Sequence, residues 1–200
     1  MFDFKNVFSL SGKTALVVGA GGLGLPIAQA LMQNGADIIL ADMKAPGEEF
    51  AALCKEEGRK YFFVEVNLLD EESIVKMVAA AKEKTGRIDI LVNAAGVNKL
   101  EKAEEYESKA WDFVLGINLR GLYLVTREVG KVMIEQQYGR ILSISSVKSF
   151  IGTDQDYTAY CASKGAVNMY TKQLACEWGK YGITANAIAP TFTRTPINSF

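Results

Sequence analysis

The sequence predicts an α/β fold, a doubly wound parallel sheet whose six strands lie in the order 3-2-1-4-5-6. From Lys13 onward, short runs rich in β-branched residues alternate with longer stretches of helical period, which is typical of βαβ units. Right-handed crossovers between these units give that strand order. Since 200 residues with 49% apolar content can bury one sizeable core, residues 1–200 are expected to form a single domain.

The elements follow one another along the chain. Strands are predicted at residues 14–18, 37–41, 61–66, 88–92, 140–145 and 184–189. Helices are predicted at residues 23–34, 48–57, 70–86, about 108–137 and about 160–178. In the first helix Leu23, Ile27 and Leu31 share one face, and Asp70 is a suitable N-cap for the third.

The sixth strand is the last that the sequence predicts before it stops at Phe200. Parallel sheets are normally covered on both faces, and an exposed edge strand favours aggregation. Either an oligomer contact covers this edge, or the chain is the front part of a longer protein. We expect the second, a domain truncated at its C-terminus with the last strand of the sheet missing.

Charge and composition exclude several function classes. The chain has 22 Lys and Arg against 23 Asp and Glu, without the basic stripe of a nucleic-acid-binding protein. No apolar run approaches the roughly 18 residues of a membrane span, and no signal peptide is evident. We therefore expect a soluble protein without nucleic-acid or membrane partners. The three cysteines are odd in number and widely spaced, which fits reduced thiols in the cytoplasm. The lack of histidine excludes Ser-His-Asp triads and histidine metal sites, and no metal is expected.

A glycine-rich stretch follows the first predicted strand. Residues 19–24, Gly-Ala-Gly-Gly-Leu-Gly, satisfy the pattern G-x-G-x-x-G where a helix opens. Such glycines allow a tight turn, close approach of the backbone to a pyrophosphate, and packing of helix on strand. Asp42 ends the second strand, where its carboxylate can accept hydrogen bonds from both ribose hydroxyls of NAD and would repel the 2′-phosphate of NADP. We therefore predict NAD as the cofactor. The simpler alternative is that the glycines only turn the chain and Asp42 is solvated.

Tyr160 and Lys164 lie four residues apart in a predicted helix and so share one face. An ammonium about 4 Å from a phenol, at an effective dielectric of ~20, contributes at most ~4 kcal/mol, or roughly 3 pKa units. That effect would bring the Tyr160 pKa from ~10 towards neutrality. The same spacing also occurs in ordinary amphipathic helices whose lysine points into solvent.

With these motifs, the sequence resembles the short-chain dehydrogenase/reductase family, which has a Rossmann-like fold, over essentially its whole length. Four further segments carry the resemblance: Asn93-Ala94-Ala95-Gly96 after the fourth strand, Asn118 in the long helix, Ser145-Ser146 ending the fifth strand, and Pro190 with Thr195 after the sixth. The resemblance implies hydride transfer at a carbon that bears an alcohol or a ketone.

The resemblance also implies a role for each catalytic residue. Tyr160 would be the general acid and base, Lys164 would lower its pKa and bind the ribose, and Ser146 would hold the carbonyl oxygen. Asn118 would distort its helix and anchor a proton relay through a water. Aligning the glycine of the following loop favours Ser146 over Ser145 for the catalytic role.

The cofactor-binding residues implied by the glycine motif and the resemblance are Gly19, Gly21, Gly22, Leu23, Gly24, Asp42, Asn67, Leu68, Asn93, Ala94, Gly96, Tyr160, Lys164, Pro190, Thr193 and Thr195. Three positions depart from the family pattern. The glycine loop is one residue short, Asn67 stands where the family commonly has an aspartate that reads the adenine amino group, and Thr191 replaces a glycine.

The expected substrate is a small molecule, a sugar acid or a polyol, because the ends of the chain are similar to those of gluconate 5-dehydrogenases. Ser146 and Tyr160 would contact it. Lys148 could reach a substrate carboxylate as a point charge, although a solvated loop lysine is the simpler interpretation. Asn98 and Phe150 would border the same pocket by their position alone.

Two other functions stay open at this point. One is a 3-oxoacyl thioester reductase, which would generally use NADPH. The other is a non-catalytic NAD-binding module, against which the presence of all four catalytic-type residues argues. The resemblance further implies a homodimer or homotetramer, packed through the helices that carry Asn118 and Tyr160.

Overall fold

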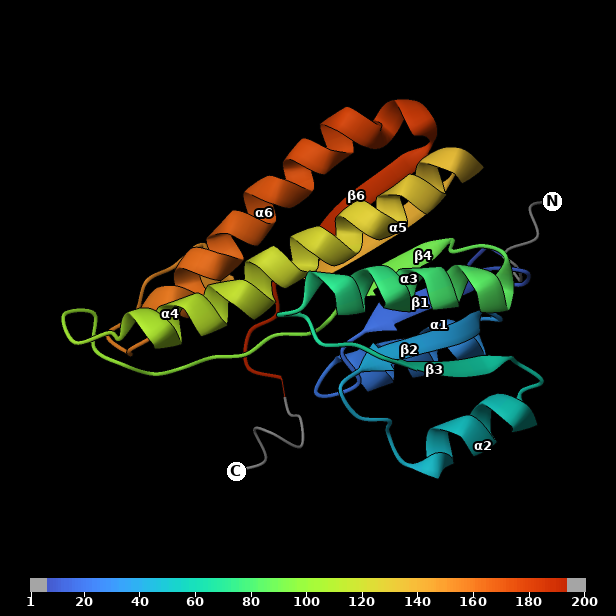
Figure 1. Ribbon diagram of the computed structural model, residues 1–200, viewed down its shortest axis with the longest axis horizontal. Helices are drawn as coiled ribbons and strands as arrows, with labels where there is room; N and C mark the ends of the chain where they lie inside the picture. Colours follow the sequence, from blue (N-terminus) through green and yellow to red (C-terminus); the bar gives the residue numbers. More distant parts are fainter. Residues whose placement is uncertain (1–6, 194–200) are drawn as a thin grey trace.

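The computed structural model describes residues 7–193, which form a parallel sheet with helices on both faces (Figure 1). The strands are β1 (Thr14–Val18), β2 (Asp37–Asp42), β3 (Tyr61–Glu65), β4 (Ile90–Asn93), β5 (Gly139–Ile144) and β6 (Ile183–Ile188). Their order, β3-β2-β1-β4-β5-β6, confirms the prediction. Every pairing is parallel, so the carboxyl ends of the strands gather along one edge of the sheet.

Two hydrophobic layers hold the helices on the sheet. Helices α1 (Gly24–Gln33) and α2 (Glu48–Glu56) cover one face, and α3 (Glu71–Thr85), α5 (Leu122–Gln136) and α6 (Thr158–Trp178) cover the other (Figure 1). Alternate residues of one strand serve the two layers: in β1, Val17 packs with α1 and α2, whereas Leu16 packs with α3 and α5. This burial on both faces explains why the central strand β1, TALVV, is apolar after Thr14.

Helix α1 lies unusually close to the sheet. Its fully buried residues are Gly24, Ala28 and Met32, one position along from the predicted face of Leu23, Ile27 and Leu31, whose side chains are only partly buried. Glycine is required at position 24 because a Cβ there would stand 1.8 Å from the Gly19 carbonyl oxygen.

The long predicted helix is interrupted near its middle. Helix α4 (Ser108–Leu115) passes through a π-helical turn, Gly116–Gly121, before α5 begins. The turn carries Asn118, which is 1% exposed, so the expected distortion around this residue is confirmed. Gly121 permits close packing there, because a Cβ on it would stand 3.0 Å from the Cβ of Leu68.

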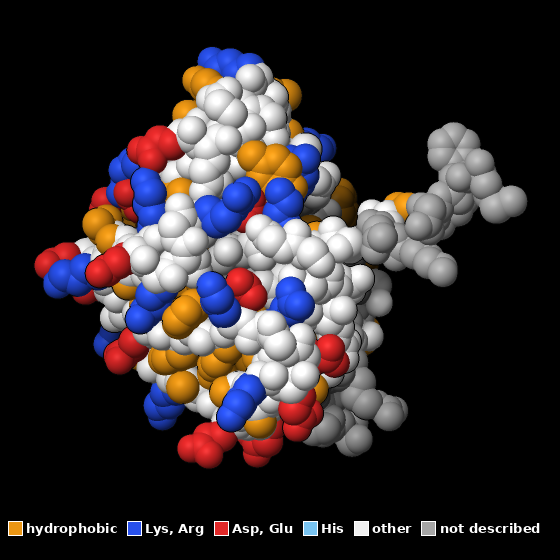
Figure 2. Space-filling model, turned by 90° about the vertical axis from the view of Figure 1, so that its right-hand side faces the viewer, with side chains coloured by type: hydrophobic (Ala, Val, Ile, Leu, Met, Phe, Trp, Pro, Cys, Tyr) orange, Lys and Arg blue, Asp and Glu red, His pale blue; other side chains and the backbone are white. Residues whose placement is uncertain are grey.

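Other local expectations also hold. The Asp70 side chain caps α3 by accepting a hydrogen bond from the Glu72 N–H at 3.0 Å, and Gly86 ends that helix at a φ of +74°. None of the helices described is long and apolar enough to span a membrane. On the face seen in Figure 2, lysine and arginine side chains lie among aspartate and glutamate side chains.

Candidate active site

A cleft follows the carboxyl edge of the sheet and consists of two adjoining cavities. The glycine-loop cavity, about 490 Å³, lies between residues 18–23, the end of β2 and the loop after β3. The tyrosine cavity, about 360 Å³, lies between the turn after β5, helix α6 and the loop after β6. Both are lined by residues 22–23 and by residues of 94–97, so they share a wall. This edge is where doubly wound sheets bind ligands, at the reversal of strand order.

Backbone hydrogen bonds fix the base of the glycine loop. The Gly19 N–H donates to the Ala41 carbonyl at 2.8 Å, and the Ala20 N–H donates to Asp42 Oδ2 at 2.6 Å. Gly19 has a φ of +103°, and a Cβ there would stand 2.5 Å from the Ala95 nitrogen, so no other residue type fits. The loop is thereby tied to the ends of β2 and β4.

The tip of the glycine loop, at Gly21 and Gly22, faces open space, whereas its base at Gly19 is closely packed. No atom lies within 4 Å of where a Cβ of Gly21 or Gly22 would stand, and both glycines line the cavity. The N-terminus of α1 follows, and its N-cap residue, Leu23, makes no side-chain capping bond. The Gly24 N–H donates to the Gly21 carbonyl at 2.8 Å and Pro26 has no N–H, so the site offers a phosphate group mainly open space and the positive end of the helix dipole. The residues present therefore fit the pyrophosphate of a dinucleotide.

Asp42 and Asn67 stand at the far end of the same cavity. Asp42 Oδ1 accepts a hydrogen bond from the Met43 N–H at 2.6 Å, and Asn67 Oδ1 accepts one from the Leu69 N–H at 3.0 Å. These oxygens have two lone pairs each, so each keeps an acceptor position for a ligand. Leu68 lines the cavity beside them.

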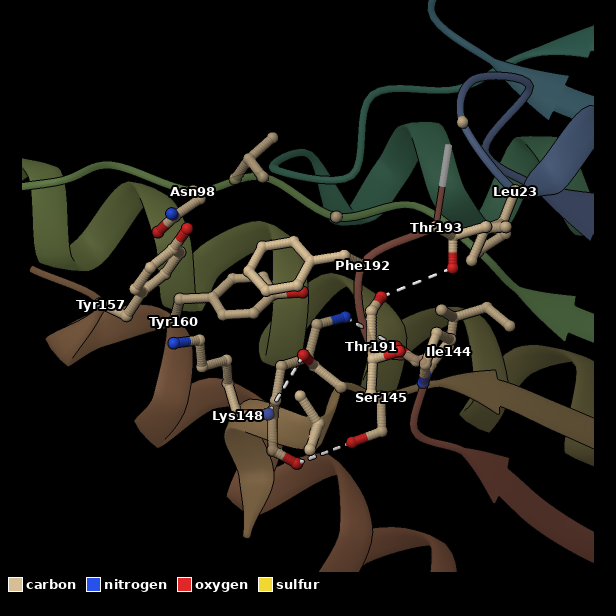
Figure 3. Close-up of a pocket in the computed structure, with 18 residues that line it drawn as sticks. Leu23, Asn98, Ile144, Ser145, Lys148, Tyr157, Tyr160, Thr191, Phe192 and Thr193 are labelled. Carbon is tan, nitrogen blue, oxygen red and sulfur yellow. Dashed lines mark hydrogen bonds between the residues drawn. The ribbon is translucent and has the colours of Figure 1, made fainter. Parts of the chain in front are cut away.

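The tyrosine cavity brings together Ser146, from the turn after β5, with Tyr160 and Lys164 of α6. Figure 3 shows Tyr160 among the lining residues, beside Tyr157. Ser146 is 8% exposed, and its Oγ accepts a hydrogen bond from the Lys148 N–H at 3.2 Å, which caps a short 3-10 turn. The Ser145 hydroxyl instead donates to the Lys164 carbonyl of α6 at 3.3 Å. The geometry therefore favours Ser146 over Ser145 as the partner of Tyr160, in line with the sequence argument.

The electrostatics of Tyr160 differ from expectation. Burial raises the pKa of the Tyr160 phenol, while its hydrogen bond with Ser146 lowers it. The Lys164 Nζ lies 5.5 Å from the Tyr160 ring centroid and donates to the Ile144 carbonyl at 2.6 Å, and the net direction of the Tyr160 pKa is upward. The predicted shift of the Tyr160 pKa towards neutrality is therefore wrong, because burial is the largest effect of the surrounding protein on this phenol. Burial instead lowers the pKa of Lys164 itself to about 8.

Asn118 reaches the site from the π-helical turn. Its Oδ1 accepts from the Val97 N–H at 2.8 Å, and its Nδ2 donates to the Val97 carbonyl at 2.8 Å and to Ser163 Oγ at 3.1 Å. Asn118 Oδ1 and Lys164 Nζ converge on Gly96, within 3.5 Å and 3.4 Å of where its Cβ would be. Asn118 thus positions the loop that forms the shared wall of the two cavities.

Several predicted site residues lie elsewhere. Asn93 lines neither large cavity, and its Nδ2 donates to Thr126 Oγ1 at 3.0 Å, so its cofactor contact stays a prediction. Gly24 is buried between helix and loop. Phe150 is 70% exposed and does not line the pocket. Thr195 falls outside the described residues.

Seven other residues that the sequence analysis singled out do lie at the site. Leu23, Ala94, Gly96, Asn98, Lys148, Pro190 and Thr193 all line the tyrosine cavity. The sequence reasoning missed Tyr157, whose ring centroid lies 6.0 Å from that of Tyr160. Tyr157 is the N-cap residue of α6, three positions before Tyr160, and this short spacing was a usable signal. Phe192, in the loop after β6, was also missed, and nothing in the sequence pattern pointed to it.

Comparison with known proteins gives consistent matches. Residues 13–200 match the family described as short chain dehydrogenase. The chain is 37% identical over 195 residues to an NAD-dependent glycerol dehydrogenase of Listeria innocua serovar 6a, covering 97% of this chain and 76% of that protein. It is 42% identical over 191 residues to a 2-dehydro-3-deoxy-D-gluconate 5-dehydrogenase of Bacillus subtilis, covering 95% and 74%.

The fold comparison agrees. The crystal structure of a gluconate 5-dehydrogenase from Burkholderia cenocepacia, in complex with NADP and tartrate, superposes with a TM-score of 0.86 at 33% identity. The match covers 96% of this chain and 75% of that one.

Proposed function

The chain belongs to the short-chain dehydrogenase family, and on that premise we propose that it is an NAD-dependent oxidoreductase that interconverts an alcohol and a ketone on a polyol or a sugar acid. The observation that carries the proposal is the shared wall of the cleft. A cavity suited to a dinucleotide adjoins one that holds a serine, a tyrosine and a lysine. The lining also includes Tyr157 and Lys148, but of the two tyrosines only Tyr160 has a hydrogen bond with Ser146.

The chain's own residues divide the work. Gly21, Gly22 and the N-terminus of α1 would hold the pyrophosphate, and Asp42 would accept hydrogen bonds from the ribose. When bound there, the nicotinamide cofactor supplies the acceptor for a hydride from the alcohol carbon. Ser146 would hold the substrate oxygen, and Tyr160 as the phenolate would accept the hydroxyl proton as the carbonyl forms, whereas the neutral phenol would donate it in the reverse direction.

Lys164 contributes differently from the first expectation. Its ammonium is held by the Ile144 carbonyl beside Gly96, which is where the shared wall faces the cofactor cavity. A ribose hydroxyl at that wall would hydrogen-bond to Lys164, and such contact with an acceptor would favour the charged lysine. Asn118 holds Val97 and thereby the position of this wall.

NAD is preferred over NADP in this proposal because of Asp42. Its carboxylate is fixed by the Ala20 and Met43 N–H groups and faces the cavity where the adenosine ribose would lie. A 2′-phosphate there would meet a negative charge. The relative from Listeria innocua is NAD-dependent by name, whereas the gluconate 5-dehydrogenase structure holds NADP, so a comparison of both cofactors is required.

The proposed enzyme is also cytoplasmic and oligomeric. An apolar face of α5 and α6 includes Tyr123 at 41% exposure and Met169 at 62%, which supports a homodimer or homotetramer.

Replacement of Tyr160 tests the function. Formation of the reduced cofactor, NADH from NAD or NADPH from NADP, is measured with a panel of polyols and sugar acids. Tyr160→Phe should lower kcat by about 10²- to 10⁴-fold on every active substrate, because the proton acceptor is lost. Tyr170→Phe, on the same helix outside the cavity, is the control. Unchanged oxidation by Tyr160→Phe would refute this mechanism. Activity confined to NADPH and 3-oxoacyl thioesters would favour the reductase alternative.

A further inference from the structure

One end of the tyrosine cavity carries a cation that the mechanism does not use. Lys148 follows Ser146 by two residues and lines the cavity. Its Nζ donates to Thr153 Oγ1 at 2.6 Å and Gln155 Oε1 at 3.4 Å, and it lies 4.4 Å from the centroid of the Tyr157 ring. A solvated loop lysine would not have three partners, so the ammonium is held in place.

The position of this cation is set by the same residues that border the reaction site. The Tyr157 ring is a neighbour of both groups, since its centroid lies 4.4 Å from the Lys148 Nζ and 6.0 Å from the Tyr160 ring centroid. Figure 3 shows Lys148, Tyr157 and Asn98 at one end of the cavity, with Tyr160 next to them. A substrate whose hydroxyl reaches Tyr160 can therefore extend its other end towards Lys148.

The charge of this end is not balanced by neighbouring carboxylates. Among the described residues that line the tyrosine cavity, the charged side chains are Lys148 and Lys164, and no aspartate or glutamate is included. Asp154 and Asp156 lie in the nearby loop, but neither lines the cavity. An ammonium has three N–H donors, and Thr153 and Gln155 take two of them, so one stays available to a ligand.

We propose that Lys148 is a specificity residue that binds a carboxylate on the substrate, so that the enzyme prefers a sugar acid to the polyol of the same carbon skeleton. The inference rests on the proposed function and narrows its substrate class. Three features carry it: a restrained cation, a free donor, and a described lining without acidic side chains. Charge-assisted hydrogen bonds to carboxylates are the strong polar contacts of binding sites.

The test compares matched substrate pairs. For the wild-type protein and for Lys148→Met, kcat/KM with NAD is measured on gluconate and glucitol, and on further acid and polyol pairs of equal chain length. The ratio of kcat/KM for the acid to that for the polyol should fall about 10- to 100-fold in Lys148→Met, mainly through a higher KM for the acid. Lys148→Arg should restore most of the ratio, and Lys172→Met, on the exposed side of α6, should leave it unchanged.

The outcomes separate the two proposals. If Lys148→Met lowers kcat/KM equally on acids and polyols, Lys148 does not select a carboxylate, while the oxidoreductase function stands. If the wild-type protein oxidises polyols well and acids poorly, the substrate class is wrong although the function is right. If it oxidises neither class with either cofactor, the proposed function fails and this inference fails with it.

Discussion

Alanine substitutions at Gly24 and Gly21 should separate a glycine that serves packing from one that leaves room for a ligand. A Cβ on Gly24 would stand 1.8 Å from the Gly19 oxygen, 2.9 Å from its carbonyl carbon and 3.2 Å from the Ala94 Cβ, so backbone must move. Alanine gains about 1 kcal/mol of helix propensity over glycine, but overpacking of this kind costs about 1–3 kcal/mol or more. We expect Gly24→Ala to lower the free energy of unfolding by about 2 kcal/mol.

For Gly21→Ala we expect the opposite result, in which stability is kept and NAD binding is weakened. Its φ is not positive and no atom lies within 4 Å of its Cβ position, so Gly21→Ala should change the free energy of unfolding by less than about 0.5 kcal/mol. The added methyl enters the glycine-loop cavity, however, and should weaken NAD binding by about tenfold or more.

The assays are urea unfolding for stability and calorimetric titration with NAD for affinity. A stable Gly24→Ala variant, or a Gly21→Ala variant that binds NAD as tightly as the wild type, would refute the assignment of these two glycines.

Two further predictions concern Asp42 and Lys164. Asp42→Asn should shift the ratio of kcat/KM for NAD to that for NADP towards NADP by about 10-fold or more, because the charge that repels the 2′-phosphate is lost; Asp37→Asn, at the other end of β2, is the control. Burial lowers the pKa of Lys164 to about 8 from 10.5. The unfolded chain therefore holds this proton more readily, and stability from Lys164 should rise as pH increases from about 8 to about 10.5. Lys164→Met should remove a rise of about 3 kcal/mol or less, as measured by urea unfolding across that range.

Each of these two predictions can be contradicted by a specific result. An NAD/NADP ratio unaltered by Asp42→Asn would show that Asp42 does not face the ribose. Parallel pH–stability curves for wild type and Lys164→Met above pH 8 would show that the Lys164 proton is held equally in both states.

The strands could be predicted because local pattern and long-range burial agree in this fold. β1 matches the prediction residue for residue, since Gly12 and Gly19 have positive φ on either side of an apolar run. β5 and β6 each begin one residue earlier than predicted, at Gly139 and Ile183, which pair with each other. Strand ends of this kind depend on the neighbouring strand, which the local sequence does not contain.

The site shows where sequence spacing stops being informative. Helical period correctly places Tyr160 and Lys164 on one face, but it does not determine the direction of a long side chain. The Lys164 ammonium is held by the Ile144 carbonyl, 20 residues away in β5. The widened turn at Asn118 likewise packs against Leu68 from the loop after β3, a contact that hydrophobic periodicity does not contain, and periodicity alone predicted one continuous helix.

Hydrogen bonds join the carboxyl ends of β1, β2 and β4, and this has a thermodynamic consequence for cofactor binding. The ends of β1 and β2 are joined by the Gly19 bond to Ala41, and those of β1 and β4 by Ala94 and Ala95, whose N–H groups both donate to the Val18 carbonyl at 2.8 Å. The wall that would face a dinucleotide is therefore already ordered by the fold. Its conformational entropy is lost during folding and does not weaken association, so contacts at this wall can contribute almost fully to affinity.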